Sequence, residues 1–525
     1  MDIHAHPSRG FWLVLALSLF LLFASRQGTW TVPQLDWDEG TRLSIGSALN
    51  HGRTLYVDAW DHHTFLDILY FQQLFRLFPT AWVPAVVRIG NALIVMGLCL
   101  LVYAGVASIA RTRTWAVAAA VACGYLLGCP WALSSHGEFY HALPVALAFY
   151  WYFAGHQDRR SLVLVGAFFA VGFFTKQTAA FDLAAFALLL AGTRLAGAKT
   201  QVGQTTATDE RATLPSGNST LCTVVQPFLW LLVGFGTVTF LSALYFLYHG
   251  SLSEAAYMTF VDPLVYATGR GMDDTLGKYA SALTDLLNYA SQVNWVITGG
   301  MVLSLALLLI RCASARTWEA ATRLALGAGV WLVVDALGLM LIGRFYAHYL
   351  VQLVVPAAIF STSFLLHVNK PALRTGLGVV WGGLLVLSAA QRWMDTRNRP
   401  ADTRWAAVQQ VVDFIRENTG PRDGIYLYQD LALCLYYQSE RFPPTPVFMD
   451  HQLLSENKDA PVLLKTALAR LAARPPKFIV VGDLGRSVPD IETFIRERYS
   501  PRTNFGSHQV LQRKPSGVKD AKEGP

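Results

Sequence analysis

Long apolar blocks recur along most of the chain and are separated by short polar joints. A helix that crosses the hydrocarbon core of a bilayer needs about 20 predominantly apolar residues. Some blocks are short, so the expected number of spans is about eleven, within about two. The blocks that we expect to be transmembrane helices are residues 11–26, 85–109, 115–133, 140–155, 161–174, 178–196, 225–248, 293–311, 322–342, 345–366 and 374–391.

The composition supports lipid as the solvent of most of the chain. Hydrophobic residues make up 53% of the 525 positions and charged residues 15%, with a mean hydropathy of +0.36. A soluble protein usually has about a quarter charged residues. The net charge of +7 is spread over the joints and the C-terminal part rather than gathered in one stripe, which argues against nucleic acid as a partner.

The distribution of Lys and Arg predicts how the helices are oriented. Cationic joints such as Arg111 with Arg113 and Arg159 with Arg160 alternate with joints that are poor in cations, such as residues 134–139. The positive-inside rule then makes the N-terminus cytoplasmic and the chain after Ala390 extracytoplasmic. We therefore expect a multi-pass membrane protein whose C-terminal domain lies outside; the family resemblance given below implies that the membrane is a bacterial inner (plasma) membrane and that this domain is periplasmic.

The expected domains follow from these blocks. Residues 1–395 form a transmembrane module, with a long first outer loop at 27–84 and a flexible cytoplasmic loop at 198–223. The first outer loop is too long to be a simple connector, which suggests that it has a function. Residues 396–515 form a small soluble α/β domain on the outer face, and residues 516–525 form a disordered tail.

The pattern of the soluble domain alternates between helix and strand, which suggests a small parallel sheet. The expected helices are residues 406–418, 463–473 and 491–499, and the expected strands are residues 424–429 and 477–481. A further helix at 65–78, in the first outer loop, has the amphipathic pattern of a segment that lies in the membrane interface.

Ionisable side chains from at least four segments gather at the expected outer boundary of the membrane. Charged groups at such positions cost free energy, so each one is a functional candidate. A mixture of acids and cations suits transfer of a group from a phosphate to a hydroxyl, because a carboxylate can take the hydroxyl proton while cations neutralise the departing phosphate. The candidates are Asp36, Asp38, Glu39, Asp58, Asp61, His62, His63, His136, Glu138, His141, Lys176, Arg344 and His348.

Several ordered motifs carry a resemblance to a known family. They are Asp36-Trp-Asp-Glu-Gly40, the run from His51 to Asp61, His136-Gly-Glu-Phe-Tyr-His141 with Leu143-Pro144, Lys176-Gln177, and the run from Gly343 to Tyr349 with Pro356. In this order, over residues 10–395, the chain resembles GT-C membrane glycosyltransferases. The similar members are bacterial protein O-mannosyltransferases and the aminoarabinose transferase of lipid A, which are glycosyltransferase 39/83-like.

The resemblance implies a GT-C-like fold and an inverting hexosyl- or pentosyltransferase. Such an enzyme moves a sugar from a polyprenyl-phosphate donor to an envelope glycan, lipid or protein acceptor. It implies that Asp38 is the catalytic carboxylate, with Glu39 beside it. Relatives often have a Lys-Pro pair, thought to face the donor phosphate, where this chain has His62-His63; His63 would replace that lysine only when protonated.

The expected roles of the remaining residues follow from charge and from the resemblance. Arg344, His348, Lys176 and His63 would contact the donor phosphate. Glu138, Asp61 and Tyr349 would position the substrates. The acids and histidines could in principle bind a divalent metal, but their spacing is not a ligand signature, so no metal or cofactor is predicted.

Most of these residues also have a purely structural alternative. Asp38 could cap a helix, and Glu39 could pair with Arg42 on a solvated helix face. Lys176 could anchor a helix at the membrane interface. Asp335, inside an apolar block, is either a buried hydrogen-bonded group or part of a conduction path.

Two other classes of function remain open at this stage. A transporter or lipid translocase would place charges in mid-helix and have inverted repeats, and no clear repeat is visible. A noncatalytic membrane scaffold would use its outer domain to bind envelope partners. A covalent sugar-transfer product distinguishes the enzyme from both.

Overall fold

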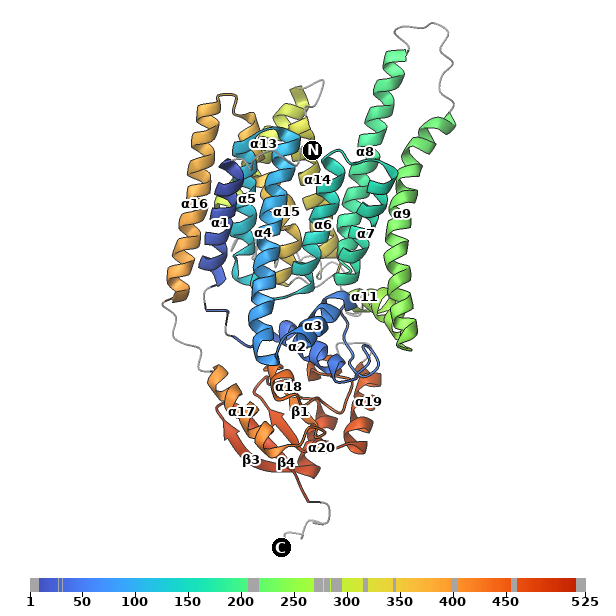
Figure 1. The fold of residues 1–525 in the computed structure, drawn as a ribbon, viewed down its shortest axis with the longest axis vertical. Coiled ribbons are helices and arrows are strands. Elements are labelled where there is room, and N and C mark those ends of the chain that lie inside the picture. Colours follow the sequence, from blue (N-terminus) through green and yellow to red (C-terminus); the bar gives the residue numbers. More distant parts are fainter. Residues whose placement is uncertain are drawn as a thin grey trace. The chain divides into compact units, whose positions relative to one another are not determined.

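The computed structural model describes residues 9–26, 28–30, 32–205, 217–268, 277, 284, 295–314, 320–342, 346–397, 404–454 and 460–515. The chain forms two compact units, coloured along the sequence in Figure 1. The helical unit consists of residues 1–27, 90–245 and 273–398, and the mixed unit consists of residues 28–89, 246–272 and 399–525. Arg344, residues 206–216 of the expected cytoplasmic loop and the expected tail at 516–525 lie outside the described residues.

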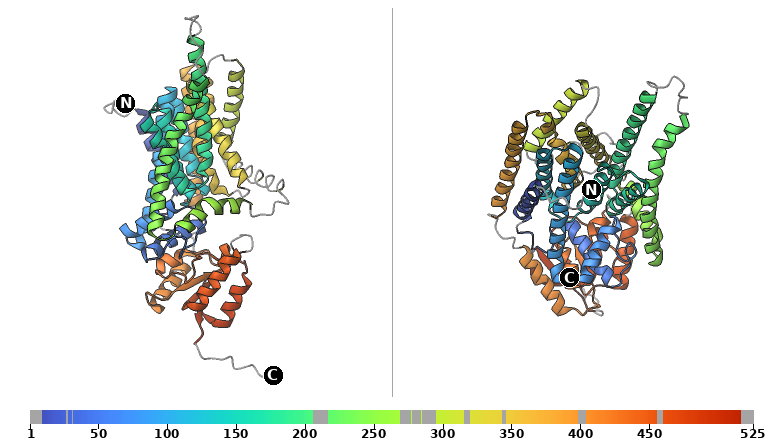
Figure 2. Two further views of the ribbon diagram at one scale, coloured as in Figure 1. Left: turned by 90° about the vertical axis from the view of Figure 1, so that its right-hand side faces the viewer. Right: turned by 45° about the horizontal axis from the view of Figure 1, so that its top comes forward.

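Each expected apolar block coincides with a helix. Helices α8 and α9 extend beyond their neighbours at one end, as Figure 1 and the right view of Figure 2 show. The helices are α1 (Arg9–Arg26), α4 (Val83–Ala110), α5 (Arg113–Leu127), α6 (Gly137–Phe153), α7 (Arg159–Thr175), α8 (Ala179–Thr205), α9 (Gly217–Tyr248), α13 (Trp295–Ser314), α14 (Ala320–Leu341), α15 (Leu350–Ser361) and α16 (Pro371–Arg397).

Five stretches of the described residues are long and apolar enough to cross a membrane. They are Thr80–Ala110, Val225–Tyr248, Ala320–Leu341, Ala347–His367 and Pro371–Asp395. Large apolar side chains on these helices are exposed, for example Leu232 at 65% and Phe240 at 62%, which is the surface that lipid covers. The chain is therefore a multi-pass membrane protein, while the expected count of about eleven spans stays a prediction.

Helix α15 forms the centre of the helical unit. It is buried along its whole length and packs against α5, α6, α13 and α14. The indole of Trp115 in α5 donates to the carbonyl of Ile359 at 3.3 Å and to the Thr362 hydroxyl at 3.0 Å. Helices α7 and α9 approach through Gly166 and Gly234, where a Cβ atom would overlap the backbone of the opposite helix.

The mixed unit contains the first outer loop and the C-terminal segment. Its helices and single turns are α2 (Trp37–Asn50), α3 (Phe65–Leu77), η1 (Thr80–Trp82), α10 (Leu252–Ala256), a π-helical turn (Tyr257–Val261), α11 (Asp262–Thr268), α17 (Arg404–Asn418), α18 (Cys434–Ser439), η7 (Asp450–Leu453), α19 (Ala460–Ala473) and α20 (Pro489–Arg498). The helix expected at 65–78 is present as α3. Its side chains Ile68 and Phe71 are buried, and Phe71 lies in close contact with Gly46 of α2.

One four-stranded sheet lies in the C-terminal segment, in the order β1 (Ile425–Tyr428), β2 (Phe478–Val481), β4 (His508–Arg513), β3 (Tyr499–Phe505). Strands β1 and β2 pair in parallel, as the alternating pattern suggested. Strands β3 and β4 form an antiparallel hairpin that the sequence did not predict, so the sheet is mixed rather than parallel. The hairpin turns at Gly506, whose φ of +58° favours glycine.

The first outer loop is attached to the C-terminal segment by hydrogen bonds to backbone atoms of that segment. The Gln34 side chain donates to the carbonyl of Leu431 and accepts from the amide of Cys434, both at 2.6 Å. The Ser44 hydroxyl donates to the carbonyl of Leu433 at 2.7 Å, and the amide of Trp60 donates to the carbonyl of Pro446 at 2.8 Å. Residues far apart in the sequence thus build the surroundings of α2.

Candidate active site

Helix α2 begins with the acidic string of the first loop. Asp36 is its N-cap and accepts from the amide of Glu39 at 2.9 Å. The capping role that could have explained Asp38 is therefore filled by Asp36. Asp38 is the second residue of the helix and is partly exposed, at the end where the helix dipole favours a carboxylate.

Glu39 is fully buried beside Asp38. Its Oε2 atom accepts from Nη1 of Arg88 at 2.8 Å, its Oε1 atom accepts from Nη2 of the same guanidinium, and Oε1 also accepts from the amide of Leu35 at 3.0 Å. Removing one partner of such a pair leaves a buried charge, which is strongly destabilising. The pair fixes the first turn of α2 to the beginning of α4.

A second buried ion pair joins α2 to α3. Nε of Arg42 donates to Oδ2 of Asp67 at 2.8 Å, and both side chains are fully buried. Oδ1 of Asp67 accepts from the amide of Ile68 at 2.9 Å. Arg42 therefore does not lie on a solvated helix face, as one alternative for Glu39 required. It forms a buried contact between two helices.

Asp61 and His63 form a compact turn downstream of α2. Oδ1 of the buried Asp61 accepts from the His63 amide at 3.1 Å and lies 2.7 Å from its Nδ1 atom. Burial alone would raise the pKa of the Asp61 carboxyl, but His63, with smaller effects of His62 and Arg42, holds it well below its usual range. The ligand atoms of Asp61, His62 and His63 lie within 4.8 Å of one another, close enough to hold one metal ion.

In the helical unit, three distant segments bring predicted site residues together. Glu138 lies in the first turn of α6 and is fully buried. Nζ of Lys176, directly after α7, is 2.8 Å from Oε1 of Glu138, and Nε2 of His348 is 3.9 Å from the same oxygen. Lys176 is only 7% exposed, so its ammonium group points to a carboxylate rather than to an interface.

Aromatic rings surround this cluster. The rings of His136 and His348 stack with centroids 4.0 Å apart, and Tyr346 stacks on the other side of His348 at 5.5 Å. Nζ of Lys176 lies 5.4 Å from the ring centroid of Tyr349, a cation–π contact.

Hydrogen bonds hold the segment that carries His136. Arg26 donates to the carbonyls of Leu133 at 2.9 Å and Ala132 at 3.2 Å. Asn91 donates to the Ser135 hydroxyl at 2.7 Å and accepts from the hydroxyl of Tyr140 at 3.0 Å. The His136 backbone therefore has support from α1 and α4.

A polar cluster that sequence reasoning missed lies deeper in the helical unit. The buried Asp182 of α8 accepts from the indole of Trp331 at 2.7 Å and from the Gln352 amide at 3.1 Å, and it lies 3.5 Å from Nε2 of His141. Asp335 is fully buried beside it. A lone acid within an apolar block was the available signal for Asp182, as it was for Asp335.

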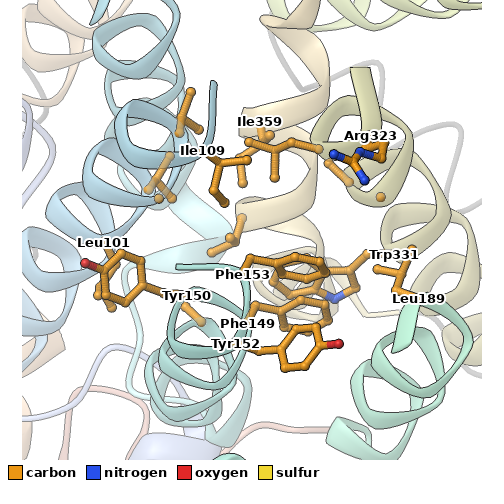
Figure 3. A pocket seen from close by; sticks show the side chains of 18 of the residues that line it. Leu101, Ile109, Phe149, Tyr150, Tyr152, Phe153, Leu189, Arg323, Trp331 and Ile359 are labelled. Atoms are coloured by element: carbon orange, nitrogen blue, oxygen red, sulfur yellow. The ribbon is translucent and has the colours of Figure 1, made fainter. Parts of the chain in front are cut away.

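An apolar cavity of about 420 Å³ lies on the other side of Trp331, between α4, α6, α8, α14 and α15 (Figure 3). The rings of Phe149 and Trp331 stack at 3.7 Å in its wall. Arg323 of α14, labelled in Figure 3, and Gly105 of α4 both line it. The volume and the lining suit a hydrocarbon chain.

The structure thus gathers Glu138, Lys176, His348 and Tyr349 in one cluster of the helical unit. In the mixed unit it places Asp38 and Glu39 side by side in α2 and joins Asp61 to His63. Arg344 is not among the described residues. No family profile matches the chain. No curated protein matches it either.

Solved structures do match. The aminoarabinose transferase ArnT of Cupriavidus metallidurans, bound to undecaprenyl phosphate, superposes with a TM-score of 0.58 over 97% of this chain and 99% of that chain, at 12% identity. The chain has the fold of the GT-C glycosyltransferases. The apo form of the same ArnT has a TM-score of 0.52, at 12% identity over 95% of this chain and 97% of that chain.

A second GT-C structure is similar over a shorter part of its own length. The oligosaccharyltransferase of Archaeoglobus fulgidus in the apo form has a TM-score of 0.51 at 11% identity, over 90% of this chain and 69% of that chain. At such identities the likeness concerns the GT-C fold alone. The residues of this chain must therefore carry any argument about its reaction.

Proposed function

We propose that this protein is a membrane glycosyltransferase that moves a sugar from a polyprenyl-phosphate donor to an envelope glycan, lipid or protein. The observation that carries the proposal is the buried Glu138–Lys176–His348 cluster, in a chain whose GT-C fold matches a transferase bound to undecaprenyl phosphate. A cation held in a dry, aromatic environment stabilises a phosphate leaving group more strongly than a solvated cation does.

In the proposed mechanism, Asp38 accepts the proton of the acceptor hydroxyl. The acceptor oxygen bonds to the anomeric carbon as the bond from that carbon to the phosphate oxygen breaks, which inverts the configuration. Polyprenyl phosphate leaves with the bonding electron pair. Lys176 and His348, with Arg344 and His63, neutralise its charge, while Glu138, Asp61 and Tyr349 position the substrates.

Asp38 and Glu39 have different parts in this proposal. Glu39 is buried and bound to Arg88 and to the Leu35 amide, so it is a poor proton acceptor and acts by positioning α2. Asp38 is partly exposed at the start of that helix and can reach a hydroxyl. We therefore assign the base to Asp38 and the orientation of the helix to Glu39.

The test is transfer of labelled sugar from polyprenyl phosphate in membranes that contain the full chain. Asp38→Asn should lower kcat about a hundredfold or more at equal protein level. Asp36→Asn is the matched control, because asparagine also caps a helix and the change removes one carboxylate two positions away. Unchanged turnover in Asp38→Asn would remove Asp38 from the mechanism, and lipid movement without a covalent product would favour a translocase.

We further propose that the protein lies in a bacterial inner membrane, with its N-terminus cytoplasmic and the mixed unit periplasmic. The alternation of cationic joints supports this orientation. Single cysteines at Arg160 and Arg502, each in a cysteine-free background, should be labelled by an impermeant thiol reagent from opposite sides. Labelling of both from the same side would contradict the proposed topology.

A further inference from the structure

A basic cavity of about 670 Å³ lies in the mixed unit, outside the residues assigned above. It opens at the edge of the sheet where β1 and β2 begin and β4 ends, next to the loop that follows α2. Five cations line it together with a single carboxylate: Arg53, Arg422, Arg474, Lys477, Arg513 and Asp423. Like charges that converge with so little compensation repel one another, and an anion relieves that repulsion.

Arg53 forms a fixed part of the wall. Its guanidinium donates to the backbone carbonyls of Pro443, of Asp58 at 3.0 Å and of Thr445 at 3.3 Å, and it lies over the ring of Phe448. Burial lowers the pKa of Arg53, Asp58 opposes this, and Arg470 and Arg474 lower the pKa further. The field of neighbouring arginines therefore reaches into the cavity.

The other cations of the cavity have fewer hydrogen bonds and ion pairs within the protein. Lys477 has its Nζ atom 3.9 Å from Asp423, and Arg513 donates to the carbonyl of Pro475 at 3.3 Å. Within the described part of the chain, no hydrogen bond or ion pair is found for the side chains of Arg422 and Arg474. Each guanidinium offers a planar fork of donors that matches two oxygens of a phosphate.

We propose that this cavity binds a phosphate or diphosphate group, with Arg422 and Arg474 as its principal ligands and Lys477 and Arg513 beside them. The ligand is a phosphorylated portion of the acceptor, which rests on the proposed function, or the headgroup of an anionic phospholipid. Both sources present the same chemistry. Phe442 and Pro444 supply an apolar wall against which a sugar ring or glycerol backbone can pack.

The test measures binding of inorganic pyrophosphate to the full chain in phosphatidylcholine nanodiscs, by titration calorimetry at low salt. The double variant Arg422→Gln/Arg474→Gln should weaken binding about tenfold or more. Arg496→Gln/Arg502→Gln removes the same charge from exposed positions of the same domain outside the cavity and should leave the affinity unchanged. Equal affinities of the wild type and the Arg422/Arg474 variant, including no binding by either, would overturn the proposal.

A second arm separates the two sources of phosphate. In nanodiscs that also contain phosphatidylglycerol, a headgroup ligand would compete with pyrophosphate, so the affinity of the wild type would fall. With a phosphate on a soluble acceptor, the affinity would be the same in both lipids. No sugar transfer is measured, so loss of the proposed function leaves the binding result intact, and a failed binding experiment leaves the transferase proposal intact.

Discussion

Nζ of Lys176 lies 2.8 Å from Oε1 of Glu138, and the two side chains are 9% and 0% exposed. The lysine follows α7 and the glutamate begins α6, so the ion pair holds the ends of two neighbouring helices together. Both charged groups are thus largely removed from solvent. The pair is therefore a structural contact as well as the centre of the proposed phosphate site.

Lys176→Met should destabilise the protein by about 3 to 5 kcal/mol, because it removes the ammonium group 2.8 Å from the fully buried carboxylate of Glu138. The double variant Lys176→Met/Glu138→Gln should recover most of that loss. Unfolding of the purified protein in detergent measures both. If the double variant is stable but does not transfer sugar, the pair acts on the substrate; additive losses would show that the two residues do not couple.

Substitution of Glu39 should mainly lower stability, whereas substitution of Asp38 should mainly lower catalysis. Glu39→Gln should lower the free energy of unfolding by about 3 kcal/mol or more, because the Arg88 guanidinium stays buried without its anion. Asp38→Asn should leave the unfolding temperature nearly unchanged and reduce kcat. Thermal unfolding and turnover are measured on the same preparations, and an equal loss of stability in both variants would argue against the division of roles.

Asp450 should make the stability of the mixed unit depend on pH. Burial raises the pKa of this carboxyl to about 6, although the amide of Gln429 donates to it at 2.6 Å. A folded pKa above the unfolded value of about 3.9 favours folding below about pH 4, and this stabilisation is lost as the pH rises through about 6. The expected loss is on the order of 2 to 3 kcal/mol.

The comparison of the wild type with Asp450→Asn isolates this group. The unfolding temperature of the full chain is measured between pH 4 and 8, a range that covers both the unfolded and the folded pKa. His508 acts in the same direction, since hydrogen bonding to Asp430 raises its pKa despite burial, and it is present in both proteins. A wild-type curve as flat as that of Asp450→Asn, after this subtraction, would contradict the raised pKa.

Filling the apolar cavity should affect a long lipid chain more than a short one. Gly105→Leu places a side chain into the cavity, where its Cβ would meet only the ring of Tyr150 at 3.6 Å. We expect a higher KM for a long-chain polyprenyl donor and little change for a short-chain analogue. Gly192→Leu is the control, because no atom lies near its Cβ; equal effects of the two variants would argue against a lipid chain in this cavity.

Much of the helical unit could be predicted, because the hydropathy of consecutive residues by itself indicates a helix surrounded by lipid. The block at 345–366 corresponds to the turn η5 (Ala347–Tyr349), α15 and the turn Ser363–His367, and the apolar run at 140–155 corresponds to α6. The hairpin of β3 and β4 escaped notice, because β3 alternates few apolar side chains and contains Pro501. Its strand character comes from pairing with β4, which is a contact across the turn.

The sequence indicated candidate residues for the site, but not the residues with which they form hydrogen bonds and ion pairs. An ionisable group near a membrane boundary is visible in the sequence, and so Asp38, Glu138, Lys176 and His348 could be named as candidates. That Asp36 is the cap, that Glu39 binds Arg88, and that Arg42 binds Asp67 could not be read from spacing. Asp182 was missed although, like Asp335, it is a lone acid within an apolar block; its partners Trp331 and Gln352 lie on other helices and could not be inferred from spacing.

The amino-acid sequence alone determined which segments of this protein are helices and which side chains carry charge near the membrane boundary, because hydropathy is a property of consecutive residues. Only the tertiary structure decided which charge meets which. A buried carboxylate must find a donor within hydrogen-bond distance, and for Glu138 and Glu39 that donor lies in another helix or loop. Such distances are set by the packing of the whole unit, which no local pattern encodes.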